Sequence, residues 1–357
     1  GLDLGFLNNR LNVSFDAYIR DTKDMLMAGK TLPGVYGASS PRMNVADLRT
    51  KGWEASVTWG DSFTLASKPF NYRIMAGIGD NTSKVTKYDN PNRTLTDPYE
   101  GQQLGEIWGY VVDGYFKTDE EARNYKVDQS FVNQMINASA LDNGLHAGDL
   151  KFVDLDGNNK IEQTTSANDR KDMKVIGNSL PRYNYNFGIS ADWYGIDFSV
   201  LFQGIGKQNW YPGAETSMFW GPYSRPYASF IPSDFMSQVW SEENTNAYFP
   251  HPRGYVALGS NRELAVVNTK YLQNLAYCRL KNLSIGYTLP DKWLSKIGFE
   301  KIRVYFSGEN LLTFTKLHSD YIDPEQASAS NSWKTSKSDA NIYPWAKTYS
   351  FGVDITF

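Results

Sequence analysis

Hydrophobic and polar residues alternate along several stretches of this chain, most clearly at residues 347–357. Tyr349, Phe351, Val353, Ile355 and Phe357 fall on one face of an extended segment there, and Thr, Ser, Gly and Asp residues fall on the other. Side chains of a β-strand alternate between its two faces with a period of two. The segment therefore predicts a strand with one wholly apolar face.

The same pattern recurs along the chain. Apolar positions alternate with polar ones in residues 11–20, 53–60, 72–79, 183–193, 196–202, 283–289 and 302–306, and residues 1–6 read as part of another strand. The count is about nine strands, each near the ten residues that a tilted strand needs to cross a bilayer. The alternation slips at 276–281, where Leu280 is out of register, which predicts a β-bulge.

Short and long connections alternate strictly between these strands. The short ones are 7–10, 61–69, 194–195 and 290–300, and the long ones are about 22–49, 83–182, 204–274 and 315–346. Outer-membrane barrels have short periplasmic turns and long extracellular loops, whereas a soluble sandwich gives no reason for all long loops to lie at one end. We therefore expect an all-β fold in which residues 1–357 form the C-terminal part of one transmembrane antiparallel β-barrel domain.

Composition narrows the function further. The 357 residues carry 36 basic and 39 acidic side chains, a balance that gives no support to nucleic-acid binding. Aromatic residues make up 15% of the chain, the mean hydropathy is −0.49, and no run of eighteen apolar residues exists, which excludes a bundle of membrane-spanning helices. The single Cys278 excludes a disulfide framework and a thiolate zinc site.

Several motifs follow one another from residue 44 to the end of the chain. They are KGWE at 51–54, EGQQLG at 100–105, GYVVDGYF at 109–116, GDLKFVD at 148–154, WSEENTNAYFP at 240–250, YCRLKNLSIGYTLP at 277–290, RVYFSGENLL at 303–312, YIDPE at 321–325, and YP at 343–344. Together with the terminal Phe357 they resemble the C-terminal portion of a SusC/RagA-type TonB-dependent outer-membrane transporter.

This resemblance implies energised nutrient import across the outer membrane of a Gram-negative bacterium. Such proteins are similar to barrels of roughly 22 strands whose lumen is closed by a plug. The implied partners are a SusD-like surface lipoprotein that acts as a lid, the TonB–ExbB–ExbD system and outer-membrane lipid, with a dimer of SusCD pairs as the expected assembly. The implied cargo is an oligosaccharide or a peptide. We expect the plug domain and the TonB box to lie outside this chain.

One loop resembles the start of a calcium-binding loop. Oxygen-bearing side chains stand at alternate positions, Asp154, Asp156 and Asn158, with the backbone carbonyl of Lys160 next, and such ligands suit Ca²⁺ or Mg²⁺. The loop departs from the EF-hand pattern, because Asn159 and Thr165 replace the Gly and Glu of its sixth and twelfth positions. Asn tolerates a left-handed backbone, so the turn can survive. The missing carboxylate would come from Asp169 or Asp172, and the resemblance favours Asp169; the alternative is an Asx-rich turn without metal.

A second loop is crowded with aromatic residues. Three interpretations compete for it: contact with a sugar or peptide, contact with the lid lipoprotein, and plain packing within the loop. The candidates for substrate or lid contact are Trp210, Tyr211, Trp220, Tyr223, Tyr227 and Trp240. A further short helix is predicted in 118–143, after Thr118 as N-cap.

The remaining residues argue against catalysis. His146, His251 and His318 are far apart in sequence, and no nucleophile elbow, phosphate-binding loop or Cys–His pair is present. We expect no enzymatic activity. The resemblance makes Phe357 part of the signal read by the barrel-insertion machinery.

Charged positions on the strands are expected to face the lumen or lie at the rims, since a charge costs a few kcal/mol on the lipid face at midplane. They are Asp16, Arg20, Glu54, Arg73, Asp192, Asp197, Arg279, Lys281, Arg303, Glu309 and Asp354. Two rival functions remain, a passive porin and a surface β-protein that binds or cleaves glycans.

Overall fold

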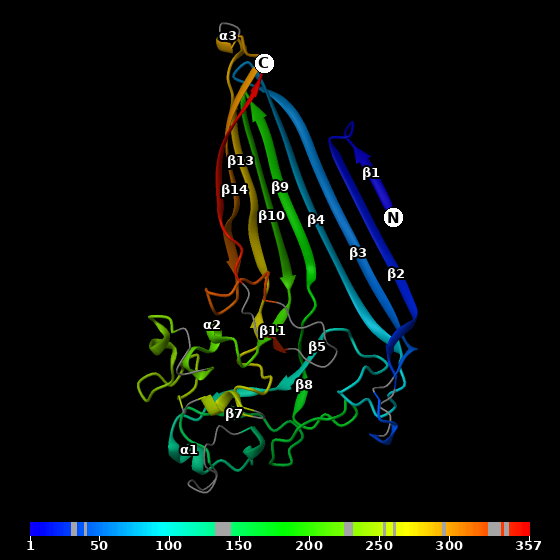
Figure 1. Ribbon diagram of the computed structural model, residues 1–357, viewed down its shortest axis with the longest axis vertical. Coiled ribbons are helices and arrows are strands. Elements are labelled where there is room, and N and C mark those ends of the chain that lie inside the picture. Colours follow the sequence, from blue (N-terminus) through cyan, green and yellow to red (C-terminus); the bar gives the residue numbers. More distant parts are fainter. Residues whose placement is uncertain are drawn as a thin grey trace.

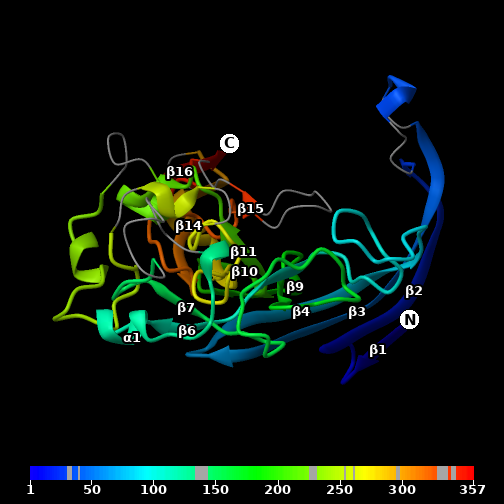
Figure 2. The same ribbon diagram turned by 90° about the horizontal axis from the view of Figure 1, so that it is seen from below.

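One large antiparallel sheet organises the molecule. The computed structural model describes all residues except 30–33, 39–40, 133–143, 225–230, 253–254, 260–261, 295–297, 328–336 and 339–342. The nine strands lie in the order β1 (Leu2–Phe6), β2 (Leu11–Ala28), β3 (Arg42–Leu65), β4 (Lys68–Lys87), β9 (Arg182–Trp193), β10 (Ile196–Lys207), β13 (Tyr277–Thr288), β14 (Lys301–Thr315) and β16 (Thr348–Thr356). Tight turns join them at one end and long loops at the other (Figure 1). Seen along the strands, the sheet follows an open curve from β1 to β16 (Figure 2).

The nine predicted strands are confirmed, but the strands of the first half are longer than expected. β2, β3 and β4 have 18, 24 and 20 residues, about twice the length needed to cross a bilayer. The predicted loop 22–49 is therefore wrong at its ends, because residues 22–28 and 42–49 pair as strands. The loops 83–182 and 204–274 likewise begin only after Lys87 and Lys207. The alternation of apolar residues stops before the hydrogen-bond ladder does, which is why the sequence pattern ended these strands too early.

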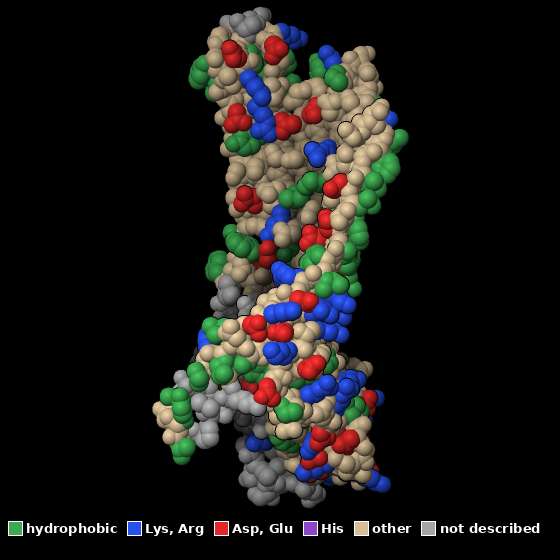
Figure 3. Space-filling model, turned by 90° about the vertical axis from the view of Figure 1, so that its right-hand side faces the viewer, with side chains coloured by type: hydrophobic (Ala, Val, Ile, Leu, Met, Phe, Trp, Pro, Cys, Tyr) green, Lys and Arg blue, Asp and Glu red, His purple; other side chains and the backbone are tan. Residues whose placement is uncertain are grey.

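The two faces of the sheet differ as the alternation predicts. One row across neighbouring strands is apolar and pairs Ala191, Phe198, Ile285, Phe306 and Phe351. The adjacent row on the opposite face is made of serines, which pair in the order Ser190, Ser199, Ser284, Ser307 and Ser350. A view toward the β1 side shows charged side chains within the hollow of the sheet and hydrophobic ones along its outer margin (Figure 3).

Among the described residues, none forms a layer over the apolar face. Phe351, Val353 and Ile285 are 83%, 57% and 44% exposed, and Ile189 and Val304 are exposed to a similar degree. Apolar side chains in regular rows without a covering layer are what a lipid-facing surface presents.

The predicted β-bulge is confirmed at Lys281. Leu201 pairs with Asn282 and Phe202 with Leu280, so Lys281 is the extra residue on β13. The ladder to β14 shifts at the same place, where Asn310 and Leu311 stand opposite Lys281. Because the bulge restores the alternation, Leu280 lies on the apolar face and Arg279 on the polar one.

The long loops fold together into a layer with its own small sheets. These pair β5 (Glu106–Tyr110) with β8 (Met173–Asn178), β6 (Val112–Tyr115) with β7 (Leu150–Phe152), and β11 (Asn209–Pro212) with β12 (Gln273–Asn274) and β15 (Lys337–Ser338). The short helices are α1 (Asp119–Arg123), α2 (Ser217–Trp220) and α3 (Asp291–Leu294), with 3₁₀ turns at Gly34–Tyr36, Ser130–Val132, Gly221–Tyr223, Phe235–Gln238 and Tyr255–Leu258. Among the described residues, no helix is long and apolar enough to cross a membrane.

Helix α1 begins as the sequence predicts. The side chain of Thr118 caps it, since the Glu121 N–H donates to Thr118 Oγ1 at 3.1 Å. Helix α3 lies in the turn between β13 and β14, at the end of the sheet opposite the loop layer (Figure 1).

Candidate functional site

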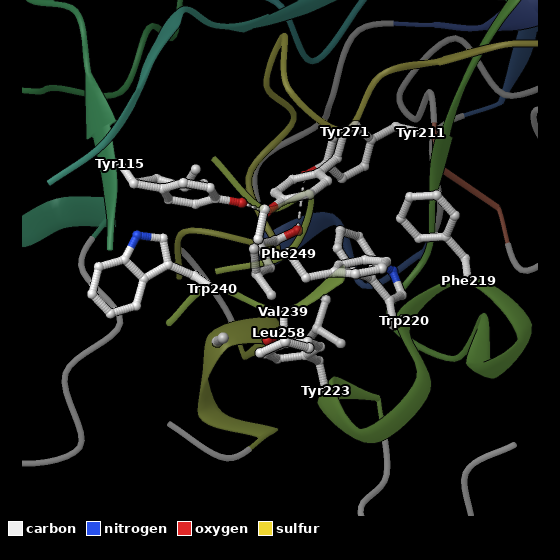
Figure 4. Close-up of a cluster of buried hydrophobic side chains, with 14 of the residues drawn as sticks. Tyr115, Tyr211, Phe219, Trp220, Tyr223, Val239, Trp240, Phe249, Leu258 and Tyr271 are labelled. Atoms are coloured by element: carbon white, nitrogen blue, oxygen red, sulfur yellow. Dashed lines mark hydrogen bonds between the residues drawn. The ribbon is translucent and has the colours of Figure 1, made fainter. Parts of the chain in front are cut away.

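The aromatic loop forms the core of the loop layer. Trp210, Tyr211 and Trp220 are fully buried, and Tyr223 and Trp240 are 2% and 5% exposed. They pack with Tyr115, Phe219, Phe249 and Tyr271 from separate loop segments (Figure 4). Phe219 meets Trp220 edge to face, with ring centroids 4.7 Å apart.

Several polar atoms of these rings have partners within the layer, whereas the buried Trp240 Nε1 has none among the described residues. Tyr211 Oη donates to the Leu264 carbonyl and Trp220 Nε1 to the Gly213 carbonyl, each at 2.9 Å. Tyr115 and Tyr271 share a hydrogen bond of 2.9 Å between their hydroxyls (Figure 4). Burial raises the pKa of Tyr211 well above its ordinary value, so its hydroxyl remains a donor at any physiological pH.

These burial values correct the expectation of a contact surface. Trp210, Tyr211, Trp220, Tyr223 and Trp240 have no exposed ring face for a sugar, a peptide or a lid lipoprotein. Plain loop packing, the third interpretation, accounts for them, because loops that stand outside a bilayer need a hydrophobic core of their own. Tyr227 lies outside the described residues.

Three carboxylates meet in the candidate cation loop. Asp154, Asp156 and Asp172 each place an oxygen within 4.8 Å of the others, and Asp172 is fully buried. Asn159 has φ of +61°, the left-handed backbone that the sequence requires there. Asp154 accepts hydrogen bonds from the Gly157 and Asn159 amides at 2.7 Å, so the loop winds around that carboxylate.

Asp172, and not Asp169, completes the carboxylate group. Asp172 accepts from the Leu155 and Glu162 amides at 2.9 and 2.7 Å, which fixes it beneath the loop. Asp169 instead sits in a turn in which its amide donates to the Ser166 carbonyl. The preference for Asp169 is therefore wrong: the chain turns at 166–169 and brings the later aspartate inward.

The electrostatics of this loop suit a cation. Desolvation raises the pKa of Asp172, and the nearby charges of Asp156 and Asp154 add to that effect. Around it, Asn158 Oδ1 accepts from the Lys160 amide at 2.8 Å, and Lys160 Nζ lies 3.8 Å from Glu162. Clustered carboxylates that destabilise one another gain when a divalent ion is bound between them.

Asp197, Arg303 and Asp354 lie on the polar face, as predicted. Arg303 pairs with Asp197 at 2.6 Å and with Asp354 at 3.4 Å across the sheet. Gly286 lies beneath this group, and a Cβ there would come within 2.5 Å of Arg303 Nη2 and Asp197 Oδ1. The glycine therefore leaves room for the guanidinium to cross its strand.

A second charged group lies on the polar face near the loop layer. Arg279 Nη2 and Nη1 bind Asp323 and Glu325 at 2.6 Å each, and Lys281 Nζ binds Glu325 at 2.7 Å. Asp323 Oδ2 also accepts from the Trp345 amide at 3.2 Å. The YIDPE segment of the sequence is thus a structural clamp between β13 and the last long loop.

A cavity of about 560 Å³ beside this clamp was not anticipated. Tyr321, Tyr343 and Trp345 line it, together with Asn310 and Asp320. The sequence contains YIDPE and YP as motifs, but alternation and spacing carry no signal that these rings share a cavity. Phe357, by contrast, is 80% exposed and contacts only the Phe299 ring among the ring contacts of the described residues, with centroids 5.2 Å apart. Its role in insertion stays a prediction.

The chain is 28% identical over its whole length to TonB-dependent receptor P3 of Formosa agariphila, and 23% identical to TonB-dependent receptor SusC of Bacteroides thetaiotaomicron. It covers 33% and 31% of those proteins. A search against family models found no match.

Solved structures agree on the fold. The RagAB peptide importer in its open-open state superposes with a TM-score of 0.66 at 21% identity, over 99% of this chain and 33% of that one. The RagAB peptide transporter gives a TM-score of 0.68 at 20% identity over 34% of its chain. The open sheet is thus a portion of a barrel-transporter fold.

These relatives are receptors and transporters, not enzymes. Over its whole length the chain is similar to proteins named TonB-dependent receptors, SusC among them, and it spans about a third of their length.

Proposed function

We propose that the protein to which this chain belongs imports a nutrient across the outer membrane of a Gram-negative bacterium, driven by TonB–ExbB–ExbD. Two observations together carry this proposal. The whole of this chain is similar to TonB-dependent receptors, and its sheet has one exposed apolar face and an opposite face that is polar and charged. A β-sheet with two such faces is typical of a barrel that separates lipid from an aqueous lumen.

The proposed assembly includes a SusD-like lipoprotein over the loop layer and a dimer of the resulting pairs. Support comes from the similarity to SusC and to RagAB, together with loops that form a packed layer at one end of the sheet. The cargo class at this level is an oligosaccharide or a peptide.

Energy coupling is the decisive test. Uptake of the nutrient should fall to the level of a deletion strain when TonB is removed or when a protonophore collapses the proton gradient. A passive porin would keep its uptake under both treatments. A surface glycan-binding or glycan-cleaving protein would leave the membrane fraction without detergent, and the barrel would not.

We further propose that Asp154, Asp156, Asn158 and Asp172 hold a structural Ca²⁺, or Mg²⁺, with the Lys160 carbonyl as a further ligand. The support is a set of hard oxygen donors with their carboxylates within 4.8 Å of one another and one of them buried. The ion would stiffen the loop between β7 and β8. Isothermal titration with CaCl₂ tests this, since Asp172→Asn should abolish the binding and Asp169→Asn should leave it unchanged.

A further inference from the structure

Three basic side chains continue the apolar face of the sheet beyond its last apolar row. On β3, Lys51 and Arg49 follow Trp53 at alternate positions toward the loop layer, and Lys84 of β4 is paired with Arg49. Residues two positions apart on a strand share a face, so all three lie on the lipid-facing side of the sheet. We call Arg49, Lys51 and Lys84 the basic band. Lys and Arg side chains gather where the sheet meets the loop layer (Figure 3).

The basic band lies at the height of the lipid headgroups. Phe63 and Trp53 are aromatic residues near the two ends of the apolar face of β3, ten positions apart. At about 3.4 Å per residue and a tilt of about 40°, they span about 26 Å, which matches the apolar band of about 25 Å between the aromatic girdles of a membrane barrel. Lys51 and Arg49 follow at about 5 and 10 Å beyond Trp53, where a bilayer has its polar headgroups.

The positive charges of the basic band are not balanced within the described part of the chain. Arg49 is paired with Asp21 at 2.7 Å, but Lys51 and Lys84 are exposed and make no ion pair with another described residue. Arg49 stands directly opposite Lys84, and Lys51 is the diagonal neighbour of Lys84, a spacing of about 7–8 Å. Like charges at this spacing repel each other, and a phosphate bound between them would relieve that repulsion.

This chain itself occupies both edges of the strands that form the basic band. β3 pairs with β2 on one side and with β4 on the other. The Val85 N–H donates to the Gln102 carbonyl at 2.9 Å, which closes the other edge of β4 at this height. A further strand of the barrel cannot be added here, because strands join a sheet only at a free edge. Protein covers the opposite face, where Thr50 and Val85 are 3% and 2% exposed.

The excess of positive charge is local to β3 and β4. On the same outward face, the loop ends of β10, β13 and β14 place Gly204, Cys278 and Phe314 in one row, and none of these residues is charged. Beyond the basic band itself, Lys87 stands opposite Asp47, so that row adds no net charge. The outward face therefore offers one basic site beside its apolar rows.

We propose that the basic band binds a phosphate of the phosphorylated glycolipid in the outer leaflet of the membrane. That leaflet is built from lipid A in Gram-negative bacteria, and the sugar phosphates of lipid A lie at the level of the headgroups. Lysine binds phosphate as a point charge, so Lys51 and Lys84 can hold one phosphate from two sides. Arg49, fixed by Asp21, adds its charge beside them. The inference goes beyond nutrient import and requires only that the apolar face meets lipid.

Native mass spectrometry of the full-length protein in detergent tests the site, with bisphosphorylated lipid A as the probe. Dephosphorylated lipid A and phosphatidylglycerol are titrated separately, the first to remove the phosphates and the second to offer a phosphate on a different lipid. The variants are Lys51→Gln, Lys84→Gln and the two together. Lys68→Gln is the matched control, because Lys68 lies on the same face of β4 as Lys84 but at its tight-turn end.

Wild type and Lys68→Gln should bind bisphosphorylated lipid A with the same affinity, and both other lipids at least tenfold more weakly. Each single variant of the basic band should weaken the binding of lipid A about fivefold and the double variant about 25-fold, the effect expected for basic residues near an anionic lipid surface. Heat-resistant migration of each variant on a gel verifies that the barrel is folded.

The proposal is overturned if bisphosphorylated lipid A does not bind, if either other lipid binds as tightly, or if the double variant binds lipid A as wild type does. These outcomes are separable from a failure of the import function. Uptake that depends on TonB in the wild type would leave that function standing while the lipid site falls.

Discussion

A lysine at Val200 is the sharpest test of which face of the sheet meets lipid. Val200 lies on β10 between Ile189 and Leu283 in a row of the apolar face. Ser199 is the next residue on the same strand and belongs to the serine row of the opposite face. Val200→Lys and Ser199→Lys therefore add the same charge at nearly the same depth, on opposite faces.

The magnitude follows from the depth of the residue. Val200 is four positions beyond Ile196, where β10 leaves its tight turn. At about 3.4 Å per residue and a tilt of about 40°, it lies about 10 Å into an apolar band that is about 25 Å tall. Lysine costs about 2–4 kcal/mol near the midplane of the lipid face, and a lumen-facing lysine costs little.

Folding of the full-length protein into lipid vesicles measures this difference. Urea titration, read by the heat-resistant band on a gel, should show Val200→Lys destabilised by about 2–4 kcal/mol and Ser199→Lys by less than about 1 kcal/mol. Val200→Leu serves as a control that keeps the apolar face and should match wild type. Equal losses in the two lysine variants would refute the assignment of the faces.

Further predictions concern separate parts of the molecule. Chelation with EGTA should speed amide hydrogen exchange across residues 154–172, and Asp172→Asn should remove that effect; unchanged exchange in the wild type would speak against a bound ion. Gly286→Val should lower the unfolding free energy by about 1–3 kcal/mol, since its Cβ collides with the Arg303–Asp197 pair, and a wild-type urea midpoint would show that the pair moves aside freely. Trp220→Ala should cost the loop layer about 3–5 kcal/mol and expose residues 208–274 to protease while the sheet stays heat-resistant; loops that resist protease would contradict the role of Trp220 in that core. Phe357→Ser should lower the amount of folded protein in the outer membrane, and equal amounts would remove the terminal aromatic from the insertion signal.

The strands could be predicted from the sequence because each strand shows its alternating pattern in its own residues. A lipid-facing strand must place an apolar residue at every second position, so each strand is visible in its own residues, and the slip at Leu280 revealed even the bulge at Lys281. The ends of β2, β3 and β4 were missed for the same reason. Beyond the lipid both faces can be polar, and only pairing with the neighbouring strand keeps residues 22–28 and 42–49 extended.

The loops depended on contacts between distant segments. The sequence shows that one loop contains many aromatic residues, but it does not show which of their rings are buried. In the structure Trp210 and Trp220 are fully buried, whereas Trp345 is 51% exposed. The choice of Asp172 over Asp169 likewise depended on how the chain turns at 166–169.

The sequence by itself therefore determined a transmembrane β-sheet with one apolar and one polar face and with its long loops at one end, because apolar and polar residues alternate within each strand. Only the tertiary structure decided which loop residues form a core, which carboxylates meet and where a cavity remains, because those properties depend on residues from separate loops that pack against one another.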